Sequence, residues 1–313
     1  MLVTLDADAA VDCGSAMSRD HCRQLEAGNI LFWPCSPVEP SADDREFLLR
    51  LDAAFAGTQK NIAYMPRRNR VTGVAKLGPM ERERLRGILR THAEGVTRLV
   101  TGLLRPYADQ LRVDYTSFRP IEEAGRGLAQ RSRNDLLHVD AFPARPTNGD
   151  RILRVFTNLH PTQPRRWITT EGFAVLVRRF AGVPSLRLSS LQHPSVWQHG
   201  MDALRSAAGT GAMARSPYDR FMLRFHDFLK ANAAFQADCP KEAHAFPPHS
   251  TWMLFTDMVP HAALSGQYAL EQTFIMARAA MLAPERAPVT ILEALCGRRL
   301  TLPAWPQPAS ARG

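Results

Sequence analysis

The chain has 313 residues, of which 45% are hydrophobic and 22% are charged, as in ordinary globular proteins. Its 39 basic side chains outnumber the 30 acidic ones, and the net charge of +9 favours an anionic partner such as a phosphorylated or carboxylated small molecule, nucleic acid or an anionic membrane face. The five cysteines are widely spaced and form no CxxC pair, which argues against a disulfide framework and against a structural zinc site.

The N-terminal third of the chain is predicted to be rich in helix. Its first residues carry acidic side chains where a secretion signal would have an apolar core, and no stretch reaches the roughly 18 apolar residues of a membrane span, so we expect a cytoplasmic protein. Residues 29–37 predict a short strand that prolines close. Ser41 is a good N-cap for a helix over residues 41–55, and residues 78–111 carry the longest helical pattern. We therefore expect residues 1–110 to form a helix-rich layer that packs on the core.

Beyond residue 110 the pattern changes to strands with helices between them. Strands are predicted over residues 111–123, 135–142, 151–160, 243–266 and 268–278, and helices over residues 171–182 and 216–236. This order places the core in residues 111–283, with a helical insertion at about 165–245, and leaves a C-terminal helix and a proline-rich tail in residues 284–313. The spacing shows no βαβ units, so the predicted fold class is α+β with a jelly-roll arrangement of strands.

The pair His138 and Asp140 is the strongest chemical signal in the sequence. The two residues stand two positions apart in a predicted strand, so their side chains project from the same face. A buried carboxylate beside a buried imidazole is costly unless the two form a hydrogen-bonded pair or hold a metal. Two histidines and one carboxylate on one face of a metal are typical of non-haem Fe(II) oxygenases. Because an isolated HxD is a weak motif, a structural His–Asp pair stays open as the alternative.

A metal site would need a third ligand from the histidines that follow Asp140. His226 lies inside a helical pattern, and His193 and His199 lie in a predicted loop. His261 stands at the junction of two predicted strands, a position that can face the mouth of a barrel. We therefore choose His261.

Four blocks of the sequence resemble the Kdo hydroxylases, which are Fe(II)- and 2-oxoglutarate-dependent dioxygenases acting on 3-deoxy-D-manno-oct-2-ulosonic acid (Kdo) of lipopolysaccharide. They are HVDAFPARPTNGDRILRVFTNLHP, YDRFMLRFHDFLK, FPPHSTWMLFTDMVPHAALSGQYALEQTF and PVTILEALCGR. The resemblance implies a double-stranded β-helix core of the jelly-roll or cupin type. It also implies iron bound by His138, Asp140 and His261, with 2-oxoglutarate and O2 as co-substrates. The implied reaction is hydroxylation at carbon 3 of Kdo in the lipid A-linked inner core.

The distal carboxylate of 2-oxoglutarate needs a cation, and an arginine fork suits it. Many related oxygenases supply an arginine shortly after the distal histidine, but here the first one is Arg278, so that rule assigns no residue. We expect Arg154 to bind this carboxylate, with Arg119 as the second choice and Gln272 as an added polar contact. The alternative for each arginine is an ordinary salt-bridged strand residue.

The residues around the two first ligands suggest how the sugar binds. Arg145 follows Asp140 closely and is expected to contact the anionic sugar, with Phe142 as a wall of the entrance. Asn158 and Tyr115 are expected to line the site. Asp257 precedes His261 and is interpreted either as a residue that orients a ligand imidazole or as a turn cap.

Two other functions stay open on the sequence alone. One is a 2-oxoglutarate oxygenase that acts on another anionic substrate, such as a nucleobase or a protein side chain. The other is a non-catalytic, cupin-like metal-binding protein. No groove-reading helix motif or aromatic stacking platform is present, so we expect no nucleic acid partner. The positive charge would allow peripheral contact with the cytoplasmic face of the inner membrane, where lipid-linked Kdo is found.

Overall fold

The computed structural model describes residues 1–6, 14–51, 62–186 and 215–303. Its strands are β1 (Leu2–Thr4), β2 (Ile30–Trp33), β3 (Ile62–Met65), β4 (Arg70–Thr72), β5 (Leu111–Arg119), β6 (Arg151–Asn158), β7 (Arg165–Thr169), β8 (Glu242–Phe246), β9 (Thr251–Phe255), β10 (His261–Ser265) and β11 (Ala269–Met276). Its α-helices are α1 (Ser15–Glu26), α2 (Ala42–Leu49), α4 (Pro79–Leu103), α5 (Phe173–Arg179), α8 (Pro217–Ala231), α9 (Ala233–Asp238) and α10 (Pro288–Cys296). Short 3-10 helices lie at Pro66–Arg68, Arg105–Gln110, Gln130–Ser132, Pro184–Leu186, Arg278–Ala280 and Pro284–Arg286.

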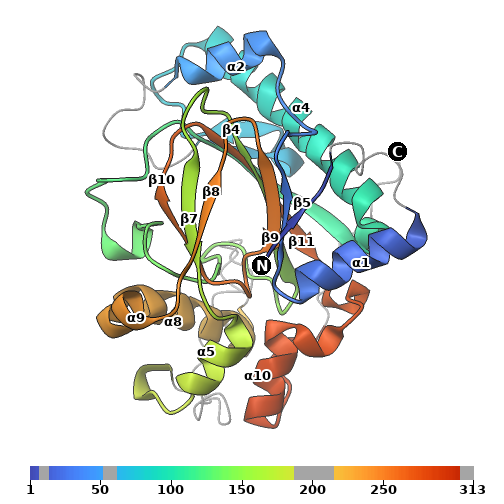
Figure 1. The fold of residues 1–313 in the computed structure, drawn as a ribbon, viewed down its shortest axis with the longest axis vertical. Helices are drawn as coiled ribbons and strands as arrows, with labels where there is room; N and C mark the ends of the chain where they lie inside the picture. The colour runs from blue at the N-terminus through green and yellow to red at the C-terminus, as the bar shows by residue number, and fades with distance from the viewer. Residues whose placement is uncertain (7–13, 52–61, 187–214, 304–313) are drawn as a thin grey trace, which may run out of the picture.

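Two β-sheets occupy the centre of the protein, with helices around them (Figure 1). The large sheet has eight strands in the order β1-β2-β9-β6-β11-β5-β3-β4, and the small sheet has three in the order β10-β7-β8. The protein is therefore a mixed α/β structure, and the predicted combination of helices with antiparallel strands is confirmed. The site residues come from both sheets, so the packing between the sheets determines the geometry of the site.

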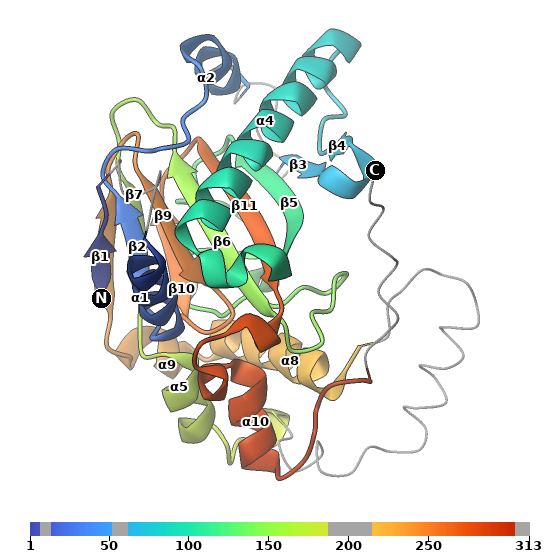
Figure 2. The same cartoon turned by 90° about the vertical axis from the view of Figure 1, so that its right-hand side faces the viewer.

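Aromatic side chains hold the two sheets face to face. Trp252 of β9 stacks on Phe246 of β8 with ring centroids 3.9 Å apart, and Phe156 of β6 meets Trp167 of β7 edge to face at 4.7 Å. Phe156 and Arg154 point toward the small sheet because alternate residues of a strand share a face. The other face of the large sheet packs against α4, which lies across it in Figure 2.

The segment before β6 differs from the prediction. Residues 135–142 were expected to form a strand, but their only ladder contact is an isolated bridge between His138 and His261. A further backbone hydrogen bond, from Asp140 N to Thr256 O at 2.8 Å, holds the end of this segment. The segment is thus an irregular strip that bridges β10 and the turn after β9.

The N-terminal part contributes more strand than expected. Four of its segments, β1 to β4, extend both edges of the large sheet, although only the strand within residues 29–37 was predicted. β1 and β2 pair in parallel with α1 between them, so the expectation that βαβ units are absent was wrong. Strands of three or four residues are too short for an alternating pattern to stand out.

The helices α5, α8, α9 and α10 gather at one end of the sheets, the lower end in Figure 1. α5, α8 and α9 all lie between β7 and β8 in the chain, inside the predicted insertion, whose two ends are strands. The predicted helix over residues 216–236 is interrupted at Asn232, whose side chain accepts a hydrogen bond from Phe235 N and caps α9. The division of the chain into three parts stays a prediction.

Candidate active site

His138, Asp140 and His261 form a compact group of possible metal ligands. Their ligand atoms all lie within 4.8 Å of one another, and all three side chains are buried. The backbones of His138 and His261 exchange two hydrogen bonds of 3.1 and 2.9 Å, which fixes the two imidazoles side by side. The structure therefore brings together the three residues chosen from the sequence, although His138 and Asp140 reach the site from an irregular segment.

Backbone carbonyls orient the two imidazoles. Nδ1 of His138 lies 2.7 Å from Leu136 O, and Nδ1 of His261 lies 2.9 Å from Val259 O. Each Nδ1 must carry a proton to donate to its carbonyl, so each Nε2 keeps its lone pair for a ligand. Trp167 stacks on the His261 ring at 5.1 Å. Burial lowers the pKa of His261 to about 4 and that of His138 well below its usual value, so both rings stay neutral at physiological pH.

Asp140 is held in its ionised form by a cation. Burial opposes its ionisation, but Arg154 Nη1 donates to Asp140 Oδ2 at 2.5 Å and holds the pKa of this carboxyl well below its usual range. Asp257 does not orient an imidazole, because its carboxylate binds Arg151 through hydrogen bonds of 2.7 and 3.0 Å. Its interpretation as a residue that supports a ligand histidine was wrong.

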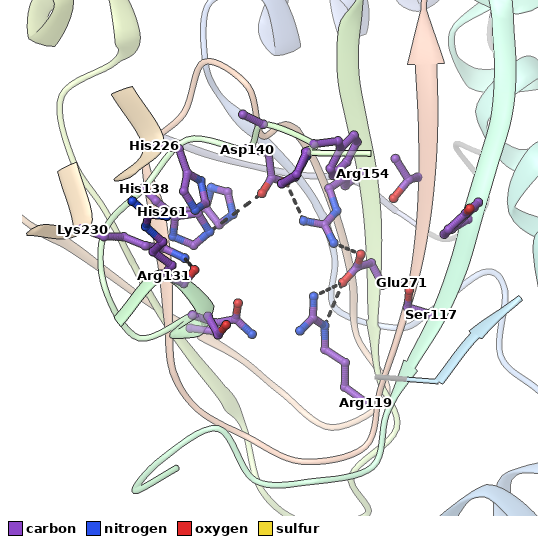
Figure 3. Close-up of a pocket in the computed structure, with 18 of the residues that line it drawn as sticks. Ser117, Arg119, Arg131, His138, Asp140, Arg154, His226, Lys230, His261 and Glu271 are labelled. Atoms are coloured by element: carbon purple, nitrogen blue, oxygen red, sulfur yellow. Dashed lines mark hydrogen bonds and ion pairs between the residues drawn. The ribbon is translucent and has the colours of Figure 1, made fainter. Parts of the chain in front are cut away.

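A cavity of about 600 Å³ opens beside the three ligands. Figure 3 shows that it has two sides: the sheet wall, defined by Arg154, Glu271 and Arg119, and the helix wall, defined by His226 and Lys230. Five residues chosen from the sequence for co-substrate or sugar line this cavity: Arg154, Arg119, Arg145, Phe142 and Tyr115.

Glu271 connects the two arginines of the sheet wall. Arg119 donates to Glu271 Oε2 through Nε at 2.8 Å and Nη2 at 2.6 Å. Arg154 forms an ion pair with Glu271 Oε1 while its other nitrogen holds Asp140. One chain of charges therefore runs from the ligand Asp140 into the sheet. Sequence reasoning missed Glu271, whose only signal was an acidic residue in the middle of a predicted strand.

Arg145 lies in an aromatic clamp at the cavity. Its guanidinium carbon stands 3.9 Å from the centroid of the Tyr115 ring and 4.2 Å from that of Phe142. Its charge is balanced by an ion pair with Asp114. Three of the four residues that the sequence analysis assigned to the sugar, Arg145, Phe142 and Tyr115, thus form one stack on the cavity wall.

The structure does not bring Gln272 and Asn158 to the cavity. Gln272 follows Glu271, so its side chain points to the opposite face of β11, where its amide oxygen accepts from Thr116 Oγ1 at 2.6 Å. Asn158 Nδ2 donates to Phe246 O and Pro247 O, each at 3.1 Å. Asn158 therefore holds the turn between β8 and β9.

Comparison with known proteins identifies the family. The chain matches the profile of the 3-deoxy-D-manno-oct-2-ulosonic acid (Kdo) hydroxylases over residues 10–299. It belongs to the Kdo hydroxylase family. The crystal structure of the Kdo hydroxylase KdoO, a non-heme Fe(II) alphaketoglutarate dependent dioxygenase in complex with alphaketoglutarate and Fe(III), is 33% identical, with a TM-score of 0.84 over 96% of this chain and 97% of that one.

Two further KdoO structures agree with that match. The cobalt(II) complex is 34% identical with a TM-score of 0.85, and the complex with succinate and Fe(III) is 33% identical with a TM-score of 0.84. Each of these two comparisons covers 98% of this chain and 99% of the other. A search of curated protein sequences finds no match. The resemblance found in the sequence is thereby confirmed.

The three ligand side chains of this Kdo hydroxylase fit an iron ion. His138 Nε2 and Asp140 Oδ1 are 3.8 Å apart, which is too far for a hydrogen bond, so the alternative of a simple His–Asp pair does not describe them. Two neutral imidazole nitrogens and an ionised carboxylate converge on a shared point beside the cavity. This donor set is the one that non-haem Fe(II) oxygenases use.

The helix wall contains two site residues that sequence reasoning missed. His226 Nδ1 lies 2.8 Å from Val139 O, and its ring meets His138 edge-on at 4.9 Å. Lys230 Nζ donates to Arg131 O at 3.0 Å, and burial lowers the pKa of this lysine to about 8. Both residues lie four positions apart on α8, so they share one helix face. That spacing was the available signal, but His226 was set aside because it lies in a helix.

Proposed function

We propose that the chain hydroxylates carbon 3 of Kdo in the lipid A-linked inner core of lipopolysaccharide. As a member of the Kdo hydroxylase family it is an Fe(II)/2-oxoglutarate-dependent dioxygenase. The observation that carries the proposal is the convergence of His138, Asp140 and His261 beside a cavity of about 600 Å³ with cations on both sides. Iron bound by these three residues supplies the oxidation of a C–H bond, which no side chain provides. The protein's own contribution is to hold the ligands, place the sugar and limit water.

We infer that the sheet wall binds 2-oxoglutarate. Arg154 and Arg119 both bind the carboxylate of Glu271, so two guanidinium groups lie together on this wall of the cavity. An arginine fork suits the distal carboxylate of a keto acid whose other end lies at the metal ligands. Arg154 reaches Asp140 directly, which makes it the first choice for this contact and keeps Arg119 as the second.

We also propose that the two sheets form a double-stranded β-helix of the jelly-roll type. The small sheet packs on the central strands of the large one through aromatic rings that meet at 3.9 and 4.7 Å. The three ligands lie between the sheets, on β10 and on the irregular segment that bridges it. This arrangement supports a barrel whose open end is the cavity.

The charge distribution supports peripheral contact of this enzyme with the cytoplasmic face of the inner membrane. Three exposed arginines, which we call the tip arginines, lie where β3 leads into β4: Arg67 and Arg68 in the turn and Arg70 as the first residue of β4. In the part of the chain that the structure describes, none of the three has a carboxylate at ion-pair distance. No helix of the described residues is long and apolar enough to cross a membrane. Each cation near an anionic bilayer contributes about 1 kcal/mol of attraction.

The first test is anaerobic titration of the purified protein with Fe(II) and 2-oxoglutarate, followed by the visible charge-transfer band of the chelated keto acid. We expect a band in the parent protein and none in His138→Ala, Asp140→Ala or His261→Ala. The matched control is His244→Ala, which should keep the band, because His244 on β8 is also buried but its Nε2 pairs with Thr169 Oγ1 on β7. A folded, iron-loaded parent without a band would contradict the metal site.

The second test locates the new hydroxyl group. The parent is given O2, 2-oxoglutarate and Kdo-linked lipid A, and the product sugar is analysed by NMR beside succinate release. We expect one succinate for each hydroxyl at carbon 3. A hydroxyl at another carbon would overturn the assigned position, and turnover of an oligonucleotide or peptide instead of the sugar would overturn the substrate.

A further inference from the structure

Lys230 is a buried cation on the helix wall of the cavity. It lies in the last turn of α8, and its residue surface is only 3% exposed. Its ammonium group has three N–H donors, of which one binds Arg131 O at 3.0 Å. Within the described residues, no carboxylate lies at ion-pair distance from Nζ. Among the described residues, Arg131 O is the one acceptor found for this ammonium group, so two of its donors are left for a ligand.

This situation is unusual among the cations of the cavity, because every arginine on its lining has a carboxylate partner. Arg119 and Arg154 share Glu271, Arg145 binds Asp114, Arg165 binds Glu123, and Arg131 binds Asp227. A buried ammonium group that lacks acceptors is costly, and a carboxylate brought by a ligand would supply them. Lys230 thus offers a site for an anion that the protein itself does not fill.

Lys230 lies on the same side of the cavity as the two ligand histidines. Figure 3 shows it next to His138 and His261, across the cavity from Arg154 and Arg119. The proposed 2-oxoglutarate site uses the sheet wall, so the helix wall is left for the second acidic molecule. An ulosonic acid carries its carboxylate as carbon 1, and only carbon 2 separates that group from carbon 3. A carboxylate held by Lys230 would therefore keep carbon 3 close to the metal ligands.

We propose that Lys230 binds the carboxylate of the acidic sugar and so selects a 2-ulosonic acid and sets which of its carbons faces the metal site. The proposal rests on the proposed function, since it assigns a residue of the same cavity to its substrate. Arg145 is then a wall of the site whose charge is already balanced by Asp114.

The test compares Lys230→Gln and Lys230→Arg with the parent. Lys230→Gln should raise KM for the sugar substrate by roughly ten- to a hundredfold, the range for a hydrogen bond to a charged group. It should leave unchanged the affinity for 2-oxoglutarate, as measured from the charge-transfer band in the anaerobic titration. Lys230→Arg, which keeps the charge, should recover part of the loss. Lys241→Gln is the matched control, because Lys241 is an exposed lysine whose Nζ likewise donates to a backbone carbonyl, Ala237 O at 2.8 Å.

A second measurement uses the substrate with its Kdo carboxylate converted to a carboxamide. The parent should lose the same factor with this compound as Lys230→Gln loses with the acid, and the variant should lose little more, because the interaction is then already absent. A parent that accepts acid and amide equally would overturn the proposal without any variant. Equal weakening of sugar and 2-oxoglutarate in Lys230→Gln would overturn it in favour of a co-substrate role.

The charge-transfer band of the parent protein distinguishes failure of the proposed function from failure of the Lys230 assignment. If the parent gives no band with Fe(II) and 2-oxoglutarate, the proposed function fails. With a band, an unchanged KM for the sugar in Lys230→Gln overturns the assignment of Lys230 alone.

Discussion

The carboxylate of Glu271 is the only link in the described structure between Arg119 and Arg154, and it is buried at 2% exposure. We expect Glu271→Gln to lower the free energy of unfolding by roughly 3–5 kcal/mol, because it leaves two buried cations without their shared anion. It should also raise KM for 2-oxoglutarate, since both arginines lose the group that positions them. Urea denaturation and steady-state kinetics measure the two effects.

The matched control for Glu271→Gln is Asp257→Asn. Asp257 is the anion of another buried pair, with Arg151, whose side chain is outside the cavity lining. Its replacement should cost a similar free energy of unfolding but leave KM for 2-oxoglutarate unchanged. If both variants changed KM alike, the effect would be a general loss of stability and Glu271 would have no specific positioning role.

The residues that could be predicted from the sequence are those whose chemistry is local. His138 and Asp140 stand out by spacing, and His261 by its place between strands. Gln272 and Glu271 show what the sequence does not reveal, which is the face of β11 on which each side chain lies. That face depends on the exact register of the strand, and the pairing of β11 with β5 is irregular between Gln272 and Phe274. The carboxylate partners of arginines come from distant strands, so spacing in the sequence does not reveal them.

At the scale of elements, the turn between β10 and β11 positions an arginine of the cavity. Gly266 has φ +125°, and a Cβ placed there would lie 2.7 Å from Cγ of Arg165 and 3.1 Å from its Cα. Arg165 Nη1 also donates to Gly266 O at 2.8 Å. We expect Gly266→Ala to lower the free energy of unfolding by more than the roughly 1–2 kcal/mol that a left-handed alanine costs, and to displace Arg165. Denaturation and 2-oxoglutarate binding measure these effects.

Gly297 provides the control for this turn. It also has a positive φ, +67°, at the end of α10, but no atom lies within 4 Å of the position of an added Cβ. Gly297→Ala should therefore show the backbone cost alone and bind 2-oxoglutarate normally. Equal losses of stability in the two variants would mean that contact with Arg165 does not matter.

The long helix α4 contains a histidine that makes stability depend on pH. Burial lowers the pKa of His92 from 6.5 to about 4, even though a hydrogen bond to the Val38 backbone opposes the shift. Between those values the unfolded chain binds more protons than the folded one, so stability falls as the pH drops from 6.5 toward 4, by about 3 kcal/mol in total. We expect His92→Leu, measured by denaturation without iron, to lose this part of the pH dependence. His138 and His261 are present in the parent and in His92→Leu alike. If the free energy of unfolding depended on pH in the same way in these two proteins, His92 would contribute nothing.

Long elements were easier to predict than short ones. α4 and the strands β5, β6 and β11 follow from clear periodic patterns, because each has at least eight residues. β1, β3 and β4 have three or four residues each, and they are strands only because a neighbouring strand supplies their hydrogen bonds. α8 was predicted as a helix, but the face that it turns to the cavity is set by how it packs under the sheets.

At the scale of the whole molecule, the order of the strands and the placement of the helices determine where the positive charge lies on the surface, which the sequence does not reveal. The strand order places β5 between β11 and β3, so the turn that carries the tip arginines extends from the same sheet that contributes Arg119 to the cavity. The helices α5 and α10 lie at the opposite end from β4 in Figure 1. A net charge of +9 gives only the amount of positive charge, whereas the fold determines which part of the surface presents it.

This arrangement predicts how the protein binds anionic vesicles. Because the tip arginines have no carboxylate partner in the described structure, their replacement by glutamine should weaken binding to phosphatidylglycerol vesicles more than a charge change elsewhere. The control removes the same charge through Arg178, Arg179 and Arg286, three exposed arginines of the α5 and α10 end. Binding of the parent, measured by co-sedimentation, should fall as salt rises from about 0.05 to 0.5 M, since screening shortens the range of these charges. If retention did not depend on salt, or if both triple variants lost it equally, the attraction would be diffuse or apolar and the tip arginines would not be the membrane-facing surface.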